Sequence, residues 1–347
     1  MMIVKFKPIG PVMFRGPGEF SPVARGPQAY ATSLPLPTPS TVSGCLATAM
    51  ERRSAASTVA PWSDTVEGAL GLKENSFLRG PYLIVNDEVY LWYQEKLVNS
   101  ENLKILRRVE LREALREGKL LDDLLNPLRI ERVPRVGIGL KEGKVVDSER
   151  GLMYLAKFVD YVATFKTTAI WIAVEAHNFD VKDVSGKMVR LGGEGKPVRL
   201  DVVDVDENKA KLYSFVKDFI RRPSDVAYLY LVSHAFIQEV SSGFEKVESG
   251  VYLWPGITRH VNDFLNKITN GGVDTEYIIG RTALLGAGYD LSRNVKKPMY
   301  IALEPGSILK VRFKANPGGL IHLLYEKGLS FVGGKLGYGT FLPIQGQ

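Results

Sequence analysis

Strand and helix patterns alternate along this chain, and some of the strands are separated only by a tight turn. Two β-rich runs, Pro81–Val85 and Val89–Tyr93, flank the polar turn at residues 86–88, which predicts a hairpin. Further along, residues 101–125 carry leucines at the spacing of an amphipathic helix. Sheets built from hairpins are antiparallel, and helices placed among them are typical of α+β proteins. The sequence therefore predicts an α+β fold with antiparallel sheets, and it disfavours a doubly wound parallel sheet.

The chain has 347 residues, which is enough for two units of this kind. The patterns recur on both sides of residues 205–226, where we place the boundary. We therefore expect an N-terminal half at residues 1–205 and a C-terminal half at residues 206–347. The other expected elements are strands at 2–7, 167–176, 198–205, 226–237, 299–303 and 307–313, and a helix at 207–220.

Basic residues are concentrated at the two ends of the chain. The net charge is +7, whereas residues 1–53 carry +4 (six basic and two acidic side chains) and residues 291–347 carry +6 (eight basic and two acidic). The interior is therefore net acidic. If the two ends lie side by side, as we expect, they form a basic surface that suits a phosphate backbone. An ordinary basic surface without a ligand is the alternative.

The segment Gly333-Gly334-Lys335-Leu336-Gly337-Tyr338-Gly339 has four glycines in seven positions. Glycine permits positive φ and a close approach to the main chain, so the glycine amides are candidates to bind a phosphate. Lys335 would add a charge, and Tyr338 a ring that stacks on a base or sugar. The spacing fits neither a Walker A motif nor a dinucleotide fingerprint. A tight turn that binds nothing is the alternative.

A long glycine- and proline-rich loop at residues 8–39 connects the first strand to the first helix. Arg15 and Arg25 are each followed by glycine, which leaves their guanidinium groups free to contact phosphates. Ser40 or Thr41 is expected to cap the helix, and the same hydroxyl and amide groups suit a phosphate. Solvated loop arginines and simple capping are the alternatives.

Two further basic segments are candidates for contact with nucleic acid. Arg52 and Arg53 are expected in the last turn of the first helix, where cations are favoured by the helix dipole. Residues 129–151 combine basic side chains with regularly placed glycines and predict a looser, basic hairpin. Its charged candidates include Arg135, Lys141 and Arg150. A surface hairpin without a ligand is the alternative.

Four segments, in this order along the chain, resemble the RAMP superfamily of CRISPR proteins. They are Pro39-Ser40-Thr41-Val42-Ser43-Gly44 after a proline-rich turn, residues 135–154, residues 279–307 and the closing glycine-rich segment. The order is most similar to a subunit of the type III-B (Cmr) effector complex. The chain departs from the family pattern in two places. The first helix lacks an early basic residue, so Arg52 and Arg53 would substitute, and Tyr289 stands where tryptophan is more usual.

The resemblance implies two ferredoxin-like halves, the first with an inserted helix and basic hairpin at about residues 100–156 and the second with the glycine-rich loop. It implies a subunit of a hetero-oligomer that holds the 5′ handle of CRISPR RNA. The expected partners are a large polymerase-like subunit on one side and the backbone RAMP subunits on the other. The comparable hairpin of the family kinks the RNA, which makes Ile138 the expected wedge. Phosphate contacts would give affinity, and splayed bases would give specificity.

An endoribonuclease of the same superfamily is a second hypothesis. RNA cleavage of that kind needs a general acid and base, commonly histidine. None of the histidines lies between Pro8 and Arg53, where the related nucleases commonly place one. The segment 271–274, Gly-Gly-Val-Asp, has one acidic residue where two-metal catalysis needs a pair. We therefore predict no catalytic residue and no metal site. The four histidines are His177, His234, His260 and His322.

Nothing in the sequence indicates a cofactor. The single cysteine, Cys45, excludes an intramolecular disulfide and a cysteine-rich zinc site. Apolar runs are shorter than the roughly 18–20 residues that cross a bilayer, and the start of the chain has no signal-peptide pattern. We therefore expect a cytoplasmic protein without membrane contact. Two other hypotheses stay open: the equivalent subunit of a type III-A complex, and a basic metabolic enzyme whose glycine-rich loop binds a nucleotide.

Overall fold

The computed structural model is a mixed α+β structure with several antiparallel sheets, as the sequence predicts. None of the described helices combines the length and the apolar character needed to cross a bilayer. The structure describes residues 1–16, 30–52, 62–118, 120–138, 140–141, 145–146, 153–192, 195–239, 257–286, 289–290, 295–296 and 298–346.

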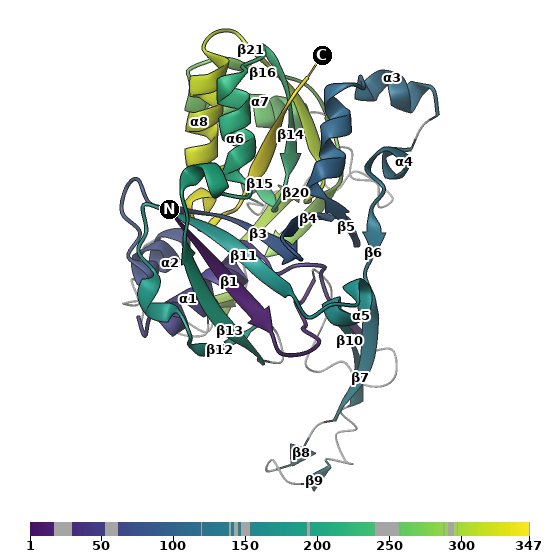
Figure 1. Ribbon diagram of the computed structural model, residues 1–347, viewed down its shortest axis with the longest axis vertical. Helices are drawn as coiled ribbons and strands as arrows, with labels where there is room; N and C mark the ends of the chain where they lie inside the picture. Colours follow the sequence, from purple (N-terminus) through teal and green to yellow (C-terminus); the bar gives the residue numbers. More distant parts are fainter. Residues whose placement is uncertain are drawn as a thin grey trace.

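The N-terminal half is built on an eight-stranded antiparallel sheet in the order β12-β13-β1-β11-β3-β4-β5-β6. The predicted hairpin is confirmed as β3 and β4, joined at Asn86 and Asp87, which both adopt positive φ. Helices α1 (Pro39–Ala49) and α2 (Trp62–Leu70) cover one face of this sheet (Figure 1). The strands are β1 (Met2–Pro8), β3 (Phe77–Val85), β4 (Glu88–Tyr93), β5 (Lys96–Asn99), β6 (Leu128–Arg129), β11 (Ile170–His177), β12 (Met188–Leu191) and β13 (Lys196–Asp204).

The C-terminal half contains a four-stranded antiparallel sheet in the order β16-β21-β14-β22, with three helices packed on it. Numbered by their order along the chain and read across the sheet from β22, these four strands follow the order fourth, first, third, second. The strands β13, β1, β11 and β3 of the first sheet have the same arrangement. The bounds are β14 (Val226–Leu231), β16 (Val273–Ile279), β21 (Ile308–Phe313), β22 (Phe341–Gln345), α6 (Tyr213–Arg221), α7 (Ile257–Thr269) and α8 (Pro317–Lys327).

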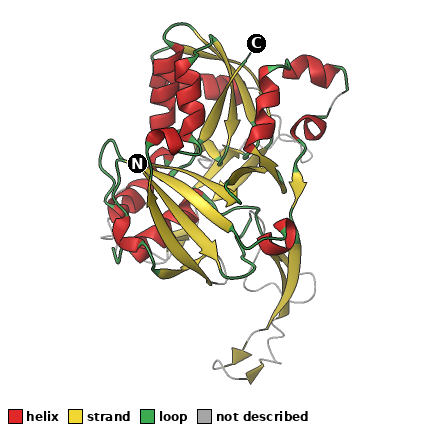
Figure 2. Ribbon diagram, in the orientation of Figure 1, coloured by secondary structure: helices red, strands yellow, loops and turns green. Residues whose placement is uncertain are grey.

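Two smaller sheets and two short strand pairs complete the description. The pair β7 and β10 runs downward from the body in Figures 1 and 2 and pairs over seven residues, so the basic segment forms an antiparallel arm. The three-stranded sheets are β2 (Tyr30–Thr32), β10 (Met153–Val159) and β7 (Arg132–Ile138), and β15 (Ala235–Glu239), β20 (Met299–Leu303) and β17 (Thr282–Gly286). The short pairs are β8 (Leu140–Lys141) with β9 (Val145–Val146), and β18 (Tyr289–Asp290) with β19 (Val295–Lys296).

The prediction of a single helix at residues 101–125 is wrong. The segment forms a 3₁₀ helix at Ser100–Arg107, then α3 (Leu111–Arg116) and α4 (Leu121–Leu125). The backbone of Glu110, between the 3₁₀ helix and α3, is extended. Its carboxylate accepts hydrogen bonds from Tyr277, at 2.6 Å, and from Lys310 of the C-terminal half. Gly118 then takes a φ of +83°, which ends the next turn.

The two sheets share apolar side chains. Tyr82 and Ile84 of β3 lie in one buried cluster with Tyr228 and Tyr230 of β14, and Phe77 is buried among residues of the C-terminal half. Each fully buried aromatic ring removes a large apolar area from water, so these contacts are a major source of stability. The two halves therefore pack on each other through their interiors. The remaining short elements among the described residues are α5 (Tyr161–Phe165) and the 3₁₀ helices η2 (Lys182–Val184), η3 (Glu207–Lys209) and η5 (Gly334–Leu336).

Candidate nucleic-acid interface

The first helix begins at Pro39, one residue before the expected cap. Thr38 is the N-cap residue, with extended φ and ψ of −76° and 157°, and Pro39 occupies the first turn, where its missing N–H costs nothing. The hydroxyl of Thr38 lies 3.1 Å from the Ser40 hydroxyl and 3.0 Å from the Thr41 hydroxyl. The prediction that Ser40 or Thr41 caps the helix is therefore wrong. Both side chains are half-buried at its start.

The same helix ends at Ala49, so the prediction that Arg52 and Arg53 lie in its last turn is also wrong. Arg52 is exposed beyond the helix, and its guanidinium donates a hydrogen bond to the carbonyl oxygen of Leu70 at the end of α2. Arg53 lies outside the described residues. Arg52 is thus oriented by a backbone carbonyl and still lies at the surface.

The glycine-rich segment folds against the N-terminal half. The Tyr338 hydroxyl donates a hydrogen bond to the Ser40 hydroxyl at 2.9 Å, and a Cβ built on Gly337 would lie 3.7 Å from the Cβ of Pro39. The expected proximity of the first fifty and the last twenty residues is therefore present.

The backbone amides of residues 336–339 in this segment donate to carbonyls of the chain itself. Gly337 donates to the carbonyl of Gly334 at 3.1 Å, and Gly339 donates to the carbonyl of His234 at 2.8 Å. Gly333, Gly337 and Gly339 are buried. The prediction that these glycines receive a phosphate does not fit this fold, because their positive φ values serve a tight turn inside the protein. Gly334 and Lys335 are half-exposed and form the accessible part of the segment.

Tyr338 belongs to the core. Its ring is 3% exposed and stacks on Phe236 with centroids 4.5 Å apart, while the ring of Trp62 meets it edge-on at 5.9 Å. Stacking on a base would require the ring to leave this packing. On this chain, Tyr338 fixes the glycine-rich segment to α1.

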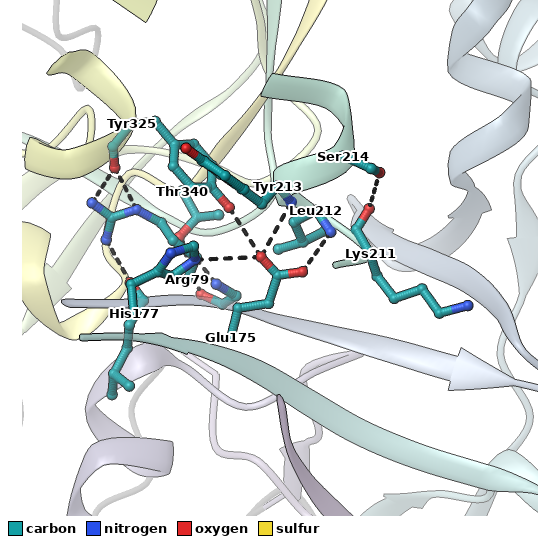
Figure 3. Close-up of polar contacts among 11 residues, drawn as sticks. Arg79, Glu175, His177, Lys211, Leu212, Tyr213, Ser214, Tyr325 and Thr340 are labelled. Carbon is teal, nitrogen blue, oxygen red and sulfur yellow. Dashed lines mark hydrogen bonds and ion pairs between the residues drawn. The ribbon is translucent and has the colours of Figure 1, made fainter. Parts of the chain in front are cut away.

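Arg79, which the sequence analysis missed, connects β3 to the segment through Gly334, and Figure 3 shows its guanidinium beside Tyr325. It is fully buried on β3, and its guanidinium donates to the carbonyls of Tyr325, at 2.6 Å, and Gly334, at 2.7 Å. Its carbon Cζ lies 4.4 Å from the ring centroid of Phe77. Burial lowers the pKa of Arg79 to about 10, so the side chain stays charged at neutral pH. An arginine inside the otherwise apolar run of residues 77–85 is the signal that could have revealed it.

Glu175 of β11 is the carboxylate of the same buried cluster (Figure 3). It is fully buried and accepts hydrogen bonds from the backbone amides of Leu212, at 2.7 Å, and Tyr213, at 3.1 Å, at the start of α6. A carboxylate at a helix N-terminus satisfies free amides and matches the helix dipole. Arg79 and Glu175 therefore connect the first sheet to the glycine-rich segment and to α6, respectively.

One predicted side chain, Arg52, lines a hollow of about 420 Å³, which we call the Arg52 hollow. Lys335 lies beside it, because its ammonium group is 3.4 Å from the carbonyl oxygen of Lys73. The cationic side chains of Arg52, Lys73 and Lys335 thus gather where the two ends of the chain meet, and Asp180 is the one acidic residue of the lining. The lining residues are Met1, Met2, Arg52, Gly71, Lys73, Ser76, Asn178, Phe179 and Asp180.

The other predicted residues lie elsewhere. Arg15 is exposed and forms an isolated backbone bridge with Ser33. Arg135 is exposed on the arm, and its guanidinium carbon lies 5.4 Å from the ring centroid of Phe158. Ile138 ends β7 and Lys141 ends β8, where only the backbone is described. Arg25 and Arg150 lie outside the described residues.

The histidines differ in environment. Burial lowers the pKa of His234 to about 3, and it also lowers the pKa of His177, whose Nε2 atom lies 3.5 Å from Glu175. Both groups are neutral at physiological pH and enclosed, which does not suit an acid–base pair at an RNA backbone. His322 pairs with Glu326 at 3.7 Å, and His260 is exposed on α7.

Comparisons with known proteins agree on one family. The family model described as "CRISPR-associated protein (Cas_Cmr3)" matches residues 4–120 and 102–320. The relative "CRISPR system CMR subunit Cmr3" of Saccharolobus solfataricus is 24% identical over 322 residues, which cover 89% of this chain and 86% of the relative.

Two solved structures are similar in fold. One is a chain of the type III-B Cmr-beta complex bound to cognate target RNA, with a TM-score of 0.58, 20% identity, and coverage of 98% of this chain and 96% of that chain. The other is a chain of the same kind of complex bound to cognate target RNA and AMPPnP, with a TM-score of 0.56, 19% identity, and coverage of 89% and 86%.

Proposed function

This chain belongs to the Cas_Cmr3 family of CRISPR-associated proteins, and from this premise we propose that it is a non-catalytic subunit of a type III-B effector complex that holds the 5′ handle of the guide RNA. The observation that carries the proposal is the gathering of Arg52, Lys73 and Lys335 at the Arg52 hollow. Phosphates are the natural ligands of such a surface, because cations there release counterions from the RNA backbone.

The proposed phosphate contacts lie at the Arg52 hollow, and the buried glycines do not contact the RNA directly. Gly334 and Lys335 present the accessible edge of the glycine-rich segment, and Arg52 lines the hollow beside which Lys335 lies. Ser40 and Thr41 lie at the start of that helix, where backbone amides favour anions. A phosphate of the handle bound at this edge would be recognised by groups from both ends of the chain.

We also propose that residues 1–205 and 206–347 are two ferredoxin-like halves. The recurrence of one antiparallel strand order in both sheets supports this. The arm formed by β7 and β10 would contact the RNA where the handle meets the guide segment, through Arg135, Ile138, Lys141 and Arg150, and the loop arginines Arg15 and Arg25 would add phosphate contacts. In the complex, the large polymerase-like subunit and the backbone RAMP subunits would be the partners.

The proposal is tested by purifying the full chain from its native host together with whatever RNA and protein it binds. We expect a ladder of short RNAs that share one 5′ end, together with the other subunits of a type III-B complex. RNAs with random 5′ ends would contradict the proposal. Recovery of the subunits of a type III-A complex would instead support that assignment. Metal-independent cleavage of repeat RNA that is lost in His260→Ala would support the endoribonuclease.

The variant Lys335→Ala is expected to weaken binding of handle RNA and to reduce the slope of log Kd against log salt by about 0.7, the value for one phosphate contact on a single strand. The measurement is a salt titration of RNA binding to the full chain. Lys104→Ala is the matched control, because Lys104 is an exposed lysine that pairs with Glu101 far from the hollow. An unchanged slope in Lys335→Ala would exclude Lys335 from the phosphate contacts.

A further inference from the structure

The second face of the N-terminal sheet is partly uncovered. Val4 and Phe6 of β1 are buried in one cluster with residues of α1, so Lys5 and Lys7 point to the opposite face. In Figure 1 the lower parts of β1, β11 and β13 face the viewer with no helix drawn in front of them. This surface is separate from the Arg52 hollow, whose lining does not include these lysines.

A tryptophan lies on this open face. Trp171 is half-buried and packs on one side against a buried cluster, whereas the other seven positions of β11 are buried. The ammonium group of Lys5 is 5.4 Å from the centroid of its ring, and that of Lys7 is 5.6 Å away. We call the surface formed by Lys5, Lys7, Trp171 and Arg199 the Trp171 face.

The Trp171 face is positively charged. Arg199 lies opposite Lys7 on β13 and pairs with Asp201 at 3.1 Å, and Asp201 lies opposite Lys5. Among the ion pairs of the described residues, none involves Lys5 or Lys7. The face therefore has an excess of positive charge. Lys7 and Arg199 also line a neighbouring hollow of about 380 Å³, whose lining includes Asp160.

An aromatic ring beside two lysines on a sheet surface suits a nucleotide. A base stacked on an aromatic side chain contributes about 1–3 kcal/mol, whereas an exposed cation–π contact contributes about 0.5–1 kcal/mol. A base can therefore displace the ammonium groups from the ring, and these groups can then bind the flanking phosphates. Protein–protein interfaces are instead depleted of lysine, so two lysines at the centre of the surface favour nucleic acid over a protein partner.

We propose that the Trp171 face is a second binding surface for single-stranded RNA, on which one base stacks against Trp171 while Lys5 and Lys7 hold adjacent phosphates. Stacking on a ring reads little sequence, so this surface accepts different bases. The inference does not rest on the handle contact at the Arg52 hollow, and the two surfaces carry different residues that can be tested separately.

The test is fluorescence anisotropy of a labelled single-stranded RNA of about 12 nucleotides, within the site sizes of sheet-based binders, with the full chain. Trp171→Ala is expected to raise Kd by about 5- to 100-fold, and Trp171→Phe, which keeps a stacking face, by less than about threefold. The double variant Lys5→Gln/Lys7→Gln should lower the salt slope by about 1.4, or 0.7 for each phosphate. The control pair Lys104→Gln/Lys314→Gln removes the same charge at two positions outside the Trp171 face, where the lysines pair with Glu101 and Asp274, and should leave the slope unchanged.

The proposal fails if Trp171→Ala folds with an unchanged melting temperature and binds RNA within twofold of the original chain. It also fails if Lys5→Gln/Lys7→Gln leaves the salt slope unchanged, and this variant changes half-exposed side chains outside the buried clusters. If Trp171→Ala releases another protein subunit while RNA binding is retained, the surface is a protein interface. The effect of Trp171→Ala should persist in a Lys335→Ala background, because the two surfaces are distinct.

Cross-linking identifies which strand occupies the face. A guide RNA or a target RNA that carries 4-thiouridine is irradiated in the assembled complex, and cross-linked peptides are mapped. We expect a peptide containing Trp171 from one of the two RNAs. Absence of this peptide from both arms, with cross-links found elsewhere on the chain, would overturn the proposal.

Discussion

Replacing Arg79 with methionine is expected to lower the free energy of unfolding by about 3–5 kcal/mol, the range for removing one partner of a buried ionic cluster. Methionine preserves most of the volume and removes every donor. The carbonyl of Tyr325 then remains buried without its donor, which costs about 1–3 kcal/mol, and the carbonyl of Gly334 keeps only the amide of Gly337. The measurement is chemical denaturation of the full chain, supported by thermal unfolding.

Arg116→Met is the matched control for this change. Arg116 is exposed on α3, so its loss should alter stability by less than about 0.5 kcal/mol. Arg79→Lys should fall between the two, because lysine keeps the charge but cannot reach both carbonyls in the planar geometry of a guanidinium. Equal stability of Arg79→Met and Arg116→Met would show that the buried arginine does not hold the glycine-rich segment in place.

Gly339→Ala is expected to cost about 3–5 kcal/mol, because two penalties of roughly 1–3 kcal/mol each act at one residue: positive φ and overpacking. Gly339 has a φ of +66°, and an added Cβ would lie 2.3 Å from the carbonyl carbon and 2.5 Å from the nitrogen of Leu329. Since these atoms belong to the backbone, the clash cannot be relieved by a side-chain rotation. Denaturant midpoints of the purified variants would measure the effect.

Gly186→Ala separates the two penalties. Gly186 also has a positive φ, +82°, but nothing lies within 4 Å of an added Cβ. The free energy of unfolding of this variant should fall only by the cost of a positive φ in alanine, about 1–2 kcal/mol. A Gly339→Ala variant no less stable than Gly186→Ala would mean that the packing around Gly339 is looser than described, and it would reopen the idea that this glycine serves a ligand.

The sequence was most informative where the pattern is local. The hairpin of β3 and β4 follows from two β-rich runs around Asn86 and Asp87, and both runs need only their own residues to be recognised. The helix expected at 101–125 failed because the position of Glu110 depends on Tyr277 and Lys310, which lie 167 and 200 residues away. A contact between residues so far apart in the sequence cannot be predicted from the local periodicity of residues 101–125.

The candidate site shows the same limit. Composition indicated that the two ends of the chain are basic, and the structure places Arg52 in the lining of one hollow and Lys335 beside the lining residue Lys73. The number of glycines does not distinguish a loop that binds an anion from a loop that is buried. Burial of this loop depends on Arg79, whose carbonyl partners are 246 and 255 residues away in the sequence. Trp171 was missed because its exposure depends on how the two halves cover the sheet.

One strand order recurs in the two sheets, yet neither sheet is closed on itself. Arg79, Glu175 and the tyrosines between the sheets connect them through the interior. Either sheet alone would expose an apolar surface and an unmatched charge that the other part now covers. Neither part is therefore expected to fold without the other.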